Sequence, residues 1–526
     1  MSTTITLVLV LLALTAVVAS FATRIRIPYA ILLVLVGVLL GLVPGLPRVT
    51  VEPDIILLLF LPPLVYASAW QTSWQQFRSN LRPILLLSVG LVLATTAIVA
   101  VVVHLAIGLP WPVAFVLGAV LSPTDAVAAS TIAQSTGLAR RIVTILEGES
   151  MVNDATGLVV YRFAVAVVMT GTFSLWQAGL QFVVVSLGGL LLGLILAWPI
   201  AWLHRHIDDA PIEITITLLT PYAAYLLAEE FHISGVLAAL AAGLYLSRHS
   251  SRFFSANTRL QANAVWNVLV FLLNGLLFLL IGLAWRTILG SITSESFGSV
   301  LGEAVLVSVS VIVIRVIWVF LATYVPRLLS PRLRRRDPDP GWRNVTIIAW
   351  TGLRGGISLA AALALPLTSA TGQAFPARNL IIELTFGVIL ATLVGQGLSL
   401  IPLIRLLRLQ TETMYEEELR QARLIATHAA LVKVEELAQM DGAASPFLAD
   451  LRAHYEHQAR HWSVKADGAM QEPIAEQAVT HQHLREEVLQ AERTAVIALR
   501  DQGQIDDEVL REMERELDLE EQRLRA

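Results

Sequence analysis

The sequence contains no cysteine, and this absence excludes disulfide bonds, thiolate catalysis and cysteine-ligated metal sites. Charged residues are also scarce, at 15% of the chain against about 25% in soluble domains. The formal net charge of −4 does not suggest a nucleic-acid partner. Apolar residues, by contrast, make up 56% of the chain and give a mean hydropathy of +0.68, which indicates a membrane protein.

The motifs of common enzyme classes are missing as well. The chain has no Walker loop, no dinucleotide glycine fingerprint and no nucleophile-elbow serine. His204 and His206 stand two residues apart and face different sides of a helix, so we expect no resident metal site there. We therefore predict a protein that is not an enzyme and needs no cofactor, and any transport must run on an ion gradient.

Charge divides the chain into two predicted domains. Residues 1–408 carry 24 basic and 16 acidic side chains, whereas residues 409–526 carry 13 and 25. A transmembrane domain followed by an acidic cytoplasmic tail accounts for this division. The apolar residues of the tail follow helical spacing, and we expect a helical hairpin that turns near Asp501–Gly503. A bundle without a ligand and a regulatory tail both remain open.

Long apolar stretches recur along the first domain and predict an all-α fold that crosses the membrane many times. We expect thirteen helices at 3–22, 27–44, 53–70, 82–107, 111–134, 141–169, 174–203, 213–230, 233–248, 262–286, 298–325, 343–368 and 378–405. Arginine tests this count, because 18 arginines follow odd-numbered helices and 3 follow even-numbered ones. The positive-inside rule then places the N-terminus outside and the C-terminus in the cytoplasm of a cell membrane.

A weak internal repeat predicts two inverted six-helix halves joined by a linker helix at 174–203. Leu61–Trp70 in the third helix parallels Leu276–Trp285 in the tenth. Interruptions occur at matching places, with Ser122-Pro-Thr-Asp125 in the fifth helix and Gly352-Leu-Arg-Gly-Gly356 in the twelfth. Two broken crossing helices on an inverted-repeat plan are typical of secondary transporters.

The polar run Glu147-Gly-Glu-Ser-Met-Val-Asn-Asp154 lies inside the sixth apolar stretch, where each unpaired charge costs about 2.5–3.5 kcal/mol on insertion scales. Ser150 and Asp154 are four residues apart and share one stripe of the helix, while Glu149 and Asn153 form a second stripe. One stripe can therefore face an ion while the other faces a structural partner.

We expect Asp154 to be the acid that binds both a cation and a proton. Removal from water favours the protonated carboxyl, so the two ions compete for one group, and competition at one site is exchange. Thr124 and Asp125, beside the break at Pro123, offer hard oxygen ligands to a small cation such as Na⁺. The alternatives are a Pro-kinked structural helix, and a static brace in which a buried acid pairs with a buried arginine.

Arg315 and Arg354 are the available counter-charges. Arg315 has apolar neighbours on both sides and cannot easily snorkel, so we expect it to pair with Glu149. Arg354 lies at the second break, where a cation offsets the dipoles of half-helices in an empty site. Structural and transport roles are equally open for both arginines.

Four motifs carry a resemblance to a known family. They are Phe60-Leu-Pro-Pro63, Ser122-Pro-Thr-Asp125, Leu146-Glu-Gly-Glu-Ser-Met-Val-Asn-Asp154 and Gly352-Leu-Arg-Gly-Gly-Ile-Ser358. Over roughly residues 1–405 the chain resembles the monovalent cation:proton antiporter-1 family, the sodium/proton exchangers. The resemblance implies a homodimer in the lipid bilayer whose core domain carries Na⁺ or H⁺ past a dimerisation domain.

The resemblance also implies roles for single residues. Asp154 matches the ion-binding aspartate of the family, and Ser150, Thr124 and Asp125 match positions that form or shape that site. Asn153 matches a position that is Asn in electroneutral members, which supports exchange of one cation (Na⁺, or K⁺ or Li⁺) for one proton. Glu149 matches the acid that pairs with a core arginine, either Arg315 or Arg354.

Two departures from the family pattern affect this interpretation. Many members carry an acid where this chain reads Tyr66-Ala67-Ser68, and the usual Thr-Asp-Pro reads Thr124-Asp125-Ala126. A sodium-coupled solute symporter and a membrane ion sensor that signals through the tail are the alternative functions. Solute uptake would identify the symporter, and cation binding without flux would identify the sensor.

Overall fold

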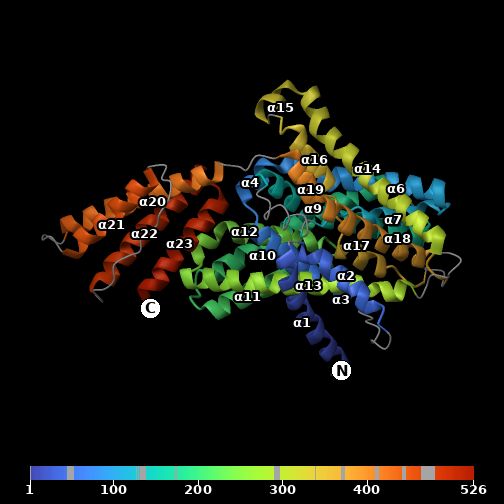
Figure 1. Cartoon of the computed structure of the whole chain (residues 1–526), viewed down its shortest axis with the longest axis horizontal. Helices are drawn as coiled ribbons and strands as arrows, with labels where there is room; N and C mark the ends of the chain where they lie inside the picture. The colour runs from blue at the N-terminus through green and yellow to red at the C-terminus, as the bar shows by residue number, and fades with distance from the viewer. Residues whose placement is uncertain are drawn as a thin grey trace.

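The computed structural model describes residues 2–25, 27–43, 53–125, 127, 130, 138–171, 174–289, 297–337, 339–368, 373–408, 414–440, 446–463 and 480–525. These residues are almost entirely helical, apart from turns and an isolated β-bridge between Thr368 and Ala374 (Figure 1). The prediction of an all-α fold is confirmed. Because lipid offers no hydrogen bonds, a helix that satisfies its own backbone is the stable form of a long apolar segment.

Eight stretches of the described chain are long and apolar enough to span a membrane. They are α1 (Ser2–Ile25), α5–η1–α6 (Leu81–Leu85, Leu86–Leu91 and Val92–Ile107), α9 (Arg140–Thr170), α10 (Leu175–His204), α11 (Ala210–Glu230), α13 (Ala256–Leu289), α14 (Phe297–Leu329) and α18–η2–α19 (Arg378–Leu390, Ala391–Gln396 and Gly397–Leu407). The other helices before the tail are α2 (Tyr29–Gly41), α3 (Pro53–Gln71), α4 (Trp74–Ser79), α7 (Trp111–Leu121), α12 (Gly235–Phe253), α15 (Pro331–Arg336), α16 (Trp342–Trp350) and α17 (Gly356–Leu363).

Most of these helices coincide with the predicted ranges to within a few residues, while the count of thirteen crossings stays a prediction. The predicted helix at 343–368 is an exception, because α17 ends at Leu363. Pro366 cannot continue a helix, and Arg378 instead donates hydrogen bonds to the carbonyls of Leu363 (2.8 Å) and Leu365 (3.0 Å). Much of the predicted range 111–134 beyond Asp125, including Ala126, lies outside the described residues.

Glycines allow two pairs of helices to approach closely. A Cβ on Gly37 of α2 would lie 2.6 Å from the carbonyl oxygen of Leu279 and 2.9 Å from the Cα of Gly282, both on α13. On α10, a side chain at Gly193 would likewise collide with the backbone of Ala238 on α12. Small residues at such contacts let helix backbones pack directly in a membrane.

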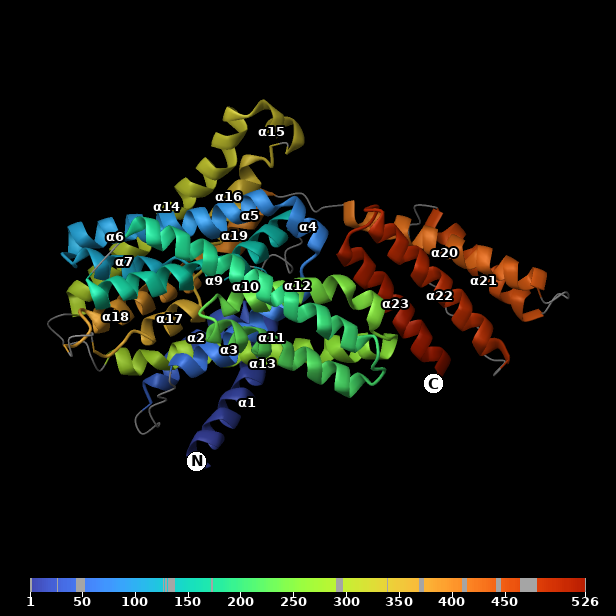
Figure 2. The same ribbon diagram turned by 180° about the vertical axis from the view of Figure 1, so that it is seen from behind.

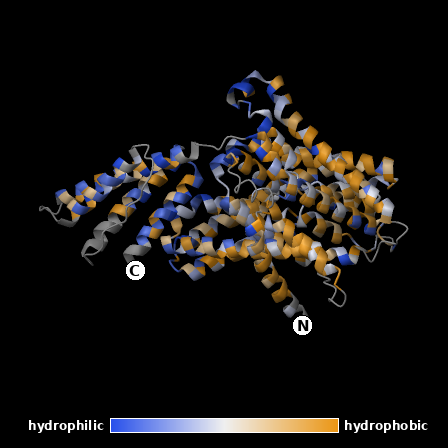
Figure 3. Cartoon of the chain, in the orientation of Figure 1, coloured by the Kyte–Doolittle hydropathy of each residue, from blue (hydrophilic) through white to orange (hydrophobic). Residues whose placement is uncertain are grey.

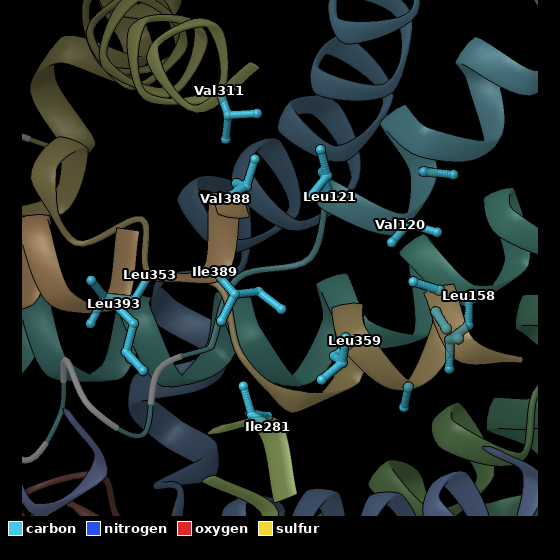
Figure 4. Close-up of a cluster of buried hydrophobic side chains, with 14 of the residues drawn as sticks. Val120, Leu121, Leu158, Ile281, Val311, Leu353, Leu359, Val388, Ile389 and Leu393 are labelled. Atoms are coloured by element: carbon cyan, nitrogen blue, oxygen red, sulfur yellow. The ribbon is translucent and has the colours of Figure 1, made fainter. Parts of the chain in front are cut away.

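The buried side chains of the membrane part form two main clusters. The larger cluster joins α5, α6, α7, α9, α14 and α16–α19 to α1, α2 and α13, and it also includes buried side chains of α3, α11 and α12. Figure 4 shows part of it, where side chains from several helices meet: Val120, Leu121, Leu158, Ile281, Val311, Leu353, Leu359, Val388, Ile389 and Leu393. The smaller cluster is rich in alanine and joins α3 to α10, α11, α12 and α13. The two clusters share α3, α11, α12 and α13, whereas α10 contributes buried members to the smaller cluster alone.

Many large apolar side chains of the membrane part are exposed, and Figure 3 colours most of its helices as hydrophobic. Helix α10 is the clearest case, because it exposes one apolar side chain on nearly every turn: Trp176, Leu180, Val184, Leu187, Leu191, Ile195, Trp198 and Trp202. A face of this size is stable only against lipid or another apolar surface.

The tail forms four helices, α20 (Met414–Met440), α21 (Pro446–Ser463), α22 (Thr480–Asp501) and α23 (Asp507–Arg525), beside one end of the helical bundle (Figures 1 and 2). The turn between α22 and α23 includes Gly503 at φ 73°, within the predicted hairpin region. Ion pairs dock α23: Asp518 binds Arg259 of α13, and Glu508 binds Arg140 of α9 at 2.7 Å. The Gly/Pro clusters at 441–446 and 471–473 predict interruptions of the tail helices, and these stretches lie largely outside the described residues.

Candidate functional site

The two polar stripes of α9 face different surroundings. Ser150 and Asp154 line a cavity of about 260 Å³, which Thr124 and Asp125 also line. Glu149 and Asn153, each only 1% exposed, point instead into the protein. The spacing in the sequence predicted that the two stripes face different surroundings, and the binding of an ion by the stripe of Ser150 and Asp154 stays a prediction.

The first break holds Thr124 at the centre of a hydrogen-bonded network. Helix α7 ends at Leu121, and residues 122–125 continue without helical structure. The Thr124 hydroxyl donates to Oε1 of Glu149 at 2.9 Å and accepts from Nδ2 of Asn153 at 2.7 Å. The Thr124 carbonyl accepts from Oγ of Ser150 at 3.0 Å. These bonds fix the broken segment against α9.

The second break, between α16 and α17, lies directly against the first. The backbone N–H of Asp125 donates to the carbonyl of Leu353 at 2.8 Å. Nε of Arg354 donates to the carbonyl of Leu121 at 3.2 Å, so a fully buried cation stands at the C-terminal end of α7. Carbonyls that a helix end leaves without partners carry partial negative charge, and a guanidinium offsets it.

Asp125 of the first break lies beside the start of α17. A side chain on Gly355, the residue before α17, would collide with the Asp125 carboxylate. One oxygen of that carboxylate accepts from the backbone N–H of Val127 at 2.8 Å. Negative charge is stabilised at a helix N-terminus. Arg354 therefore lies at the C-terminal end of α7, which carries partial negative charge. Asp125 lies at the N-terminal end of α17, which carries partial positive charge.

Glu149 pairs with Arg315 rather than with Arg354. NH2 of Arg315 donates to Oε2 of Glu149 at 2.9 Å, and NH1 donates to Oε1, which makes a two-pronged ion pair. Both side chains are about 1% exposed. NH2 also donates to the carbonyl of Ile348 at 3.0 Å, which attaches the pair to α16. A buried pair of this kind braces α9 against α14 and α16.

Asp154 lines the cavity without a structural partner among the described residues. It is 7% exposed, and within the described part of the chain its carboxylate accepts no protein hydrogen bond. The Asp125 carboxylate acts on it electrostatically. A nearly buried carboxylate that faces a cavity and another acid is suited to bind a cation or a proton.

The cavity wall contains several polar residues that we did not predict from the sequence. Asn274 of α13 is 3% exposed and lines the cavity, as do Tyr29 of α2 and Ser68 of α3. Asn274 and Gly275 interrupt an apolar run, and this interruption was the available signal in the sequence. Glu147, the first residue of the polar run, also lines the cavity. Ala67, near which the family resemblance implies an acid, lines it as well.

An all-helical membrane protein with a buried polar site at two helix breaks belongs to the class of secondary transporters. The family model described as "Sodium/hydrogen exchanger, transmembrane" matches residues 9–406, and the chain belongs to this family. The predicted resemblance is confirmed. This is a family of transporters, and the chain is accordingly a membrane protein with several transmembrane helices.

Individual relatives agree with this assignment. The chain is 39% identical to an uncharacterised Na⁺/H⁺ exchanger of Mycobacterium tuberculosis, over 95% of this chain and 92% of the relative. It is 35% identical to the sodium, potassium, lithium and rubidium/H⁺ antiporter of Bacillus pumilus, over 74% of this chain and 59% of that protein.

The structure of the sodium proton antiporter MjNhaP1 from Methanocaldococcus jannaschii superposes with a TM-score of 0.57 at 20% identity. The match covers 77% of this chain and 98% of that one. At this level of identity the match demonstrates the fold.

Proposed function

We propose that this chain exchanges Na⁺ for H⁺ across the membrane by competition of the two ions for Asp154. Membership of the sodium/hydrogen exchanger family supports the reaction. The position of Asp154 carries the assignment of the site, since this nearly buried carboxylate faces the cavity without a protein donor in the described chain.

In this mechanism the cation binds to oxygen atoms of Asp154, Asp125, Ser150 and Thr124, with Asn153 shaping the site through Thr124. Proximity supports the set, because four of these residues line one cavity and Asn153 donates to Thr124. Carboxylate, hydroxyl and carbonyl oxygens are the ligands that hard cations prefer. A proton on Asp154 removes the charge that holds Na⁺, so each arriving ion displaces the other. One Na⁺ for one H⁺ leaves the site charge unchanged, which makes the exchange electroneutral.

Glu149, Arg315 and Arg354 act in this proposal as a brace and not as ligands. Both oxygens of Glu149 are taken by Arg315, and Arg354 is held by backbone carbonyls. Fixed charges at the two breaks keep the half-helix ends in place whether the site holds Na⁺ or H⁺. The brace therefore lets the ions compete at Asp154 alone.

Transport further requires the site to open alternately to the two sides. We propose that the body formed by α5–α7, α9 and α14–α19 moves against the body of α3 and α10–α12. This division is supported by the alanine-rich cluster, which contains no side chain of the first body. Thirteen crossings in two inverted repeats, a homodimer in the cell membrane, and an outside N-terminus with a cytoplasmic C-terminus complete the proposal. Residues 1–408 form its exchanger domain and residues 409–526 its cytoplasmic tail.

The choice of cation includes K⁺ and Li⁺ besides Na⁺. The name of the Bacillus pumilus relative includes sodium, potassium, lithium and rubidium. Ala67 leaves the cavity without the acid that many members carry at this place, and fewer charged ligands weaken discrimination among monovalent cations.

Reconstituted vesicles with an internal pH dye test the proposal directly. The purified native chain should give proton flux that depends on Na⁺, and Asp154→Asn should abolish it while the protein still folds. Asp208→Asn is the matched control, because this exposed carboxylate lies between α10 and α11 and should leave flux unchanged. Flux retained in Asp154→Asn would place the site elsewhere, and no cation-dependent flux from the native chain would reject exchange.

A further inference from the structure

Three arginines from three helices converge on one carboxylate outside the exchange site. Asp337, which follows α15, accepts hydrogen bonds from Arg82 of α5 at 3.2 Å, Arg141 of α9 at 2.6 Å and Arg327 of α14 at 2.6 Å. All four side chains are between 11% and 39% exposed. The group therefore lies at the surface, where a ligand can reach it.

The positive charge of this group exceeds its negative charge. Burial by itself would raise the pKa of Asp337, but Arg141 and Arg327 lower it below its ordinary value, so the carboxylate is ionised at neutral pH. The single negative charge of Asp337 balances the positive charge of one of the three guanidinium groups. The next acid, Asp339, accepts a hydrogen bond from the backbone N–H of Gly341 at 2.9 Å. Like charges held this close attract a second anion.

A cavity of about 170 Å³ opens beneath the three arginines. Its walls include Leu87, Ile145, Val319 and Ile348, all less than 10% exposed, with Asn344 as a neutral polar group. A soluble inorganic anion gains nothing from these apolar walls. A ligand with a charged head and a hydrocarbon chain gains from both parts of the site.

The surrounding surface has the composition of a membrane interface. Leu328 and Leu329 are each 79% exposed and Trp342 is 57% exposed, while Arg334 and Arg335 are exposed on α15. Helix α15 projects from the end of α14, and Figure 3 colours it hydrophilic beside the apolar α14. Apolar and aromatic side chains next to a cluster of arginines are typical of segments that bind anionic lipid.

We infer that this cavity binds an anionic phospholipid, with the phosphate against Arg82, Arg141 and Arg327 and the first methylenes of an acyl chain among the apolar walls. Asp337 competes with the phosphate for the same guanidinium groups. Zwitterionic lipids bind more weakly, because their ammonium group meets the excess positive charge. Ile348 lines this cavity and also accepts a hydrogen bond from Arg315, so the bound lipid contacts the helix that holds the Glu149 brace.

Native mass spectrometry of the purified full chain, titrated with phosphatidylglycerol or phosphatidylcholine, measures the selectivity. An arginine near an anionic lipid surface changes affinity about five-fold, so Arg82→Gln with Arg141→Gln should weaken phosphatidylglycerol binding on the order of 25-fold. Arg205→Gln is the matched control, because this exposed arginine after α10 lies outside the cavity. Equal loss in the control and the double variant would overturn the site, as would equal binding of both lipids.

Asp337→Asn separates a lipid site from a structural brace. Removing the competing carboxylate should tighten phosphatidylglycerol binding about five-fold, whereas a brace that binds nothing would lose stability without any gain in binding. This variant keeps all three arginines, so misfolding of the double variant does not decide the outcome. Inorganic phosphate is the second probe. Displacement of phosphatidylglycerol by inorganic phosphate at equal concentration would reject lipid as the ligand.

Discussion

The buried pair of Glu149 and Arg315 makes a quantitative prediction possible. Removing one partner of a buried ion pair leaves an uncompensated charge and costs about 3–5 kcal/mol. Both side chains are about 1% exposed, and two hydrogen bonds join them. Glu149→Met and Arg315→Met should therefore each lower the free energy of unfolding by about that amount.

The double variant distinguishes a pair from two independent residues. With both charges removed, apolar side chains of similar length fill the site, and most of the loss should be recovered. A residual cost of about 1–3 kcal/mol remains, because the Thr124 hydroxyl loses its acceptor on Glu149. The coupling energy between the two single substitutions should then be at least about 3 kcal/mol, which is at or above the upper end of measured pairs.

Arg162 and Glu229 provide a control of the same chemistry at the surface. NH2 of Arg162 donates to both Glu229 oxygens at 2.7 and 2.9 Å, but the two side chains are 49% and 31% exposed. The same cycle should give about 1 kcal/mol or less there. Unfolding by denaturing detergent in mixed micelles, followed by tryptophan fluorescence, gives the free energies. Equal coupling in the two cycles, or additive costs at Glu149 and Arg315, would refute the reasoning.

Two further predictions concern packing and pH. Gly37→Ala should separate α2 from α13 and lower stability by about 1–3 kcal/mol in the same unfolding assay, whereas Gly41→Ala, whose Cβ would lie 3.5 Å from its nearest neighbour, should be tolerated. Equal losses would contradict the close contact. In the tail, burial and the nearby Glu520 raise the pKa of Glu492 well above its usual value, so the folded tail keeps this proton to higher pH than the unfolded chain. The stability of the tail therefore falls as the pH rises through the pKa of Glu492 in the folded protein. Glu492→Gln should slow hydrogen exchange of α22 at pH 8 but not at pH 4, and no difference at pH 8 would contradict this prediction.

Hydropathy predicted the helices well, because lipid offers the backbone no hydrogen bonds and a long apolar segment must satisfy its own as a helix. Apolar runs gave α9, α10 and α14 to within a few residues, and the proline and glycine clusters located both helix breaks. The wide turns at Leu86–Leu91 and Ala391–Gln396 left no comparable signal, because a local π-helical geometry depends on packing and not on composition.

The charged residues of the candidate site were easier to predict from the sequence than the neutral ones, because burying a charge costs more free energy. Glu149, Asp154 and Arg315 are visible in the sequence because a charge among apolar residues needs a reason. Asn274 is neutral and costs less, and its place in the cavity wall depends on how α13 packs against α2 and α3. The docking of α23 was also unpredictable, because its acids resemble any solvated helix until their arginine partners are known.

The attachment of α23 at two points has a mechanical consequence. Glu508 is bound to α9 and Asp518 to α13, ten residues further along, or about 15 Å of straight helix at 1.5 Å per residue. A helix does not stretch, so α23 keeps its two attachment points, on α9 and α13, at a fixed separation. A displacement of α9 relative to α13 by more than the few ångströms that two side chains can absorb must break the ion pair at one end of α23.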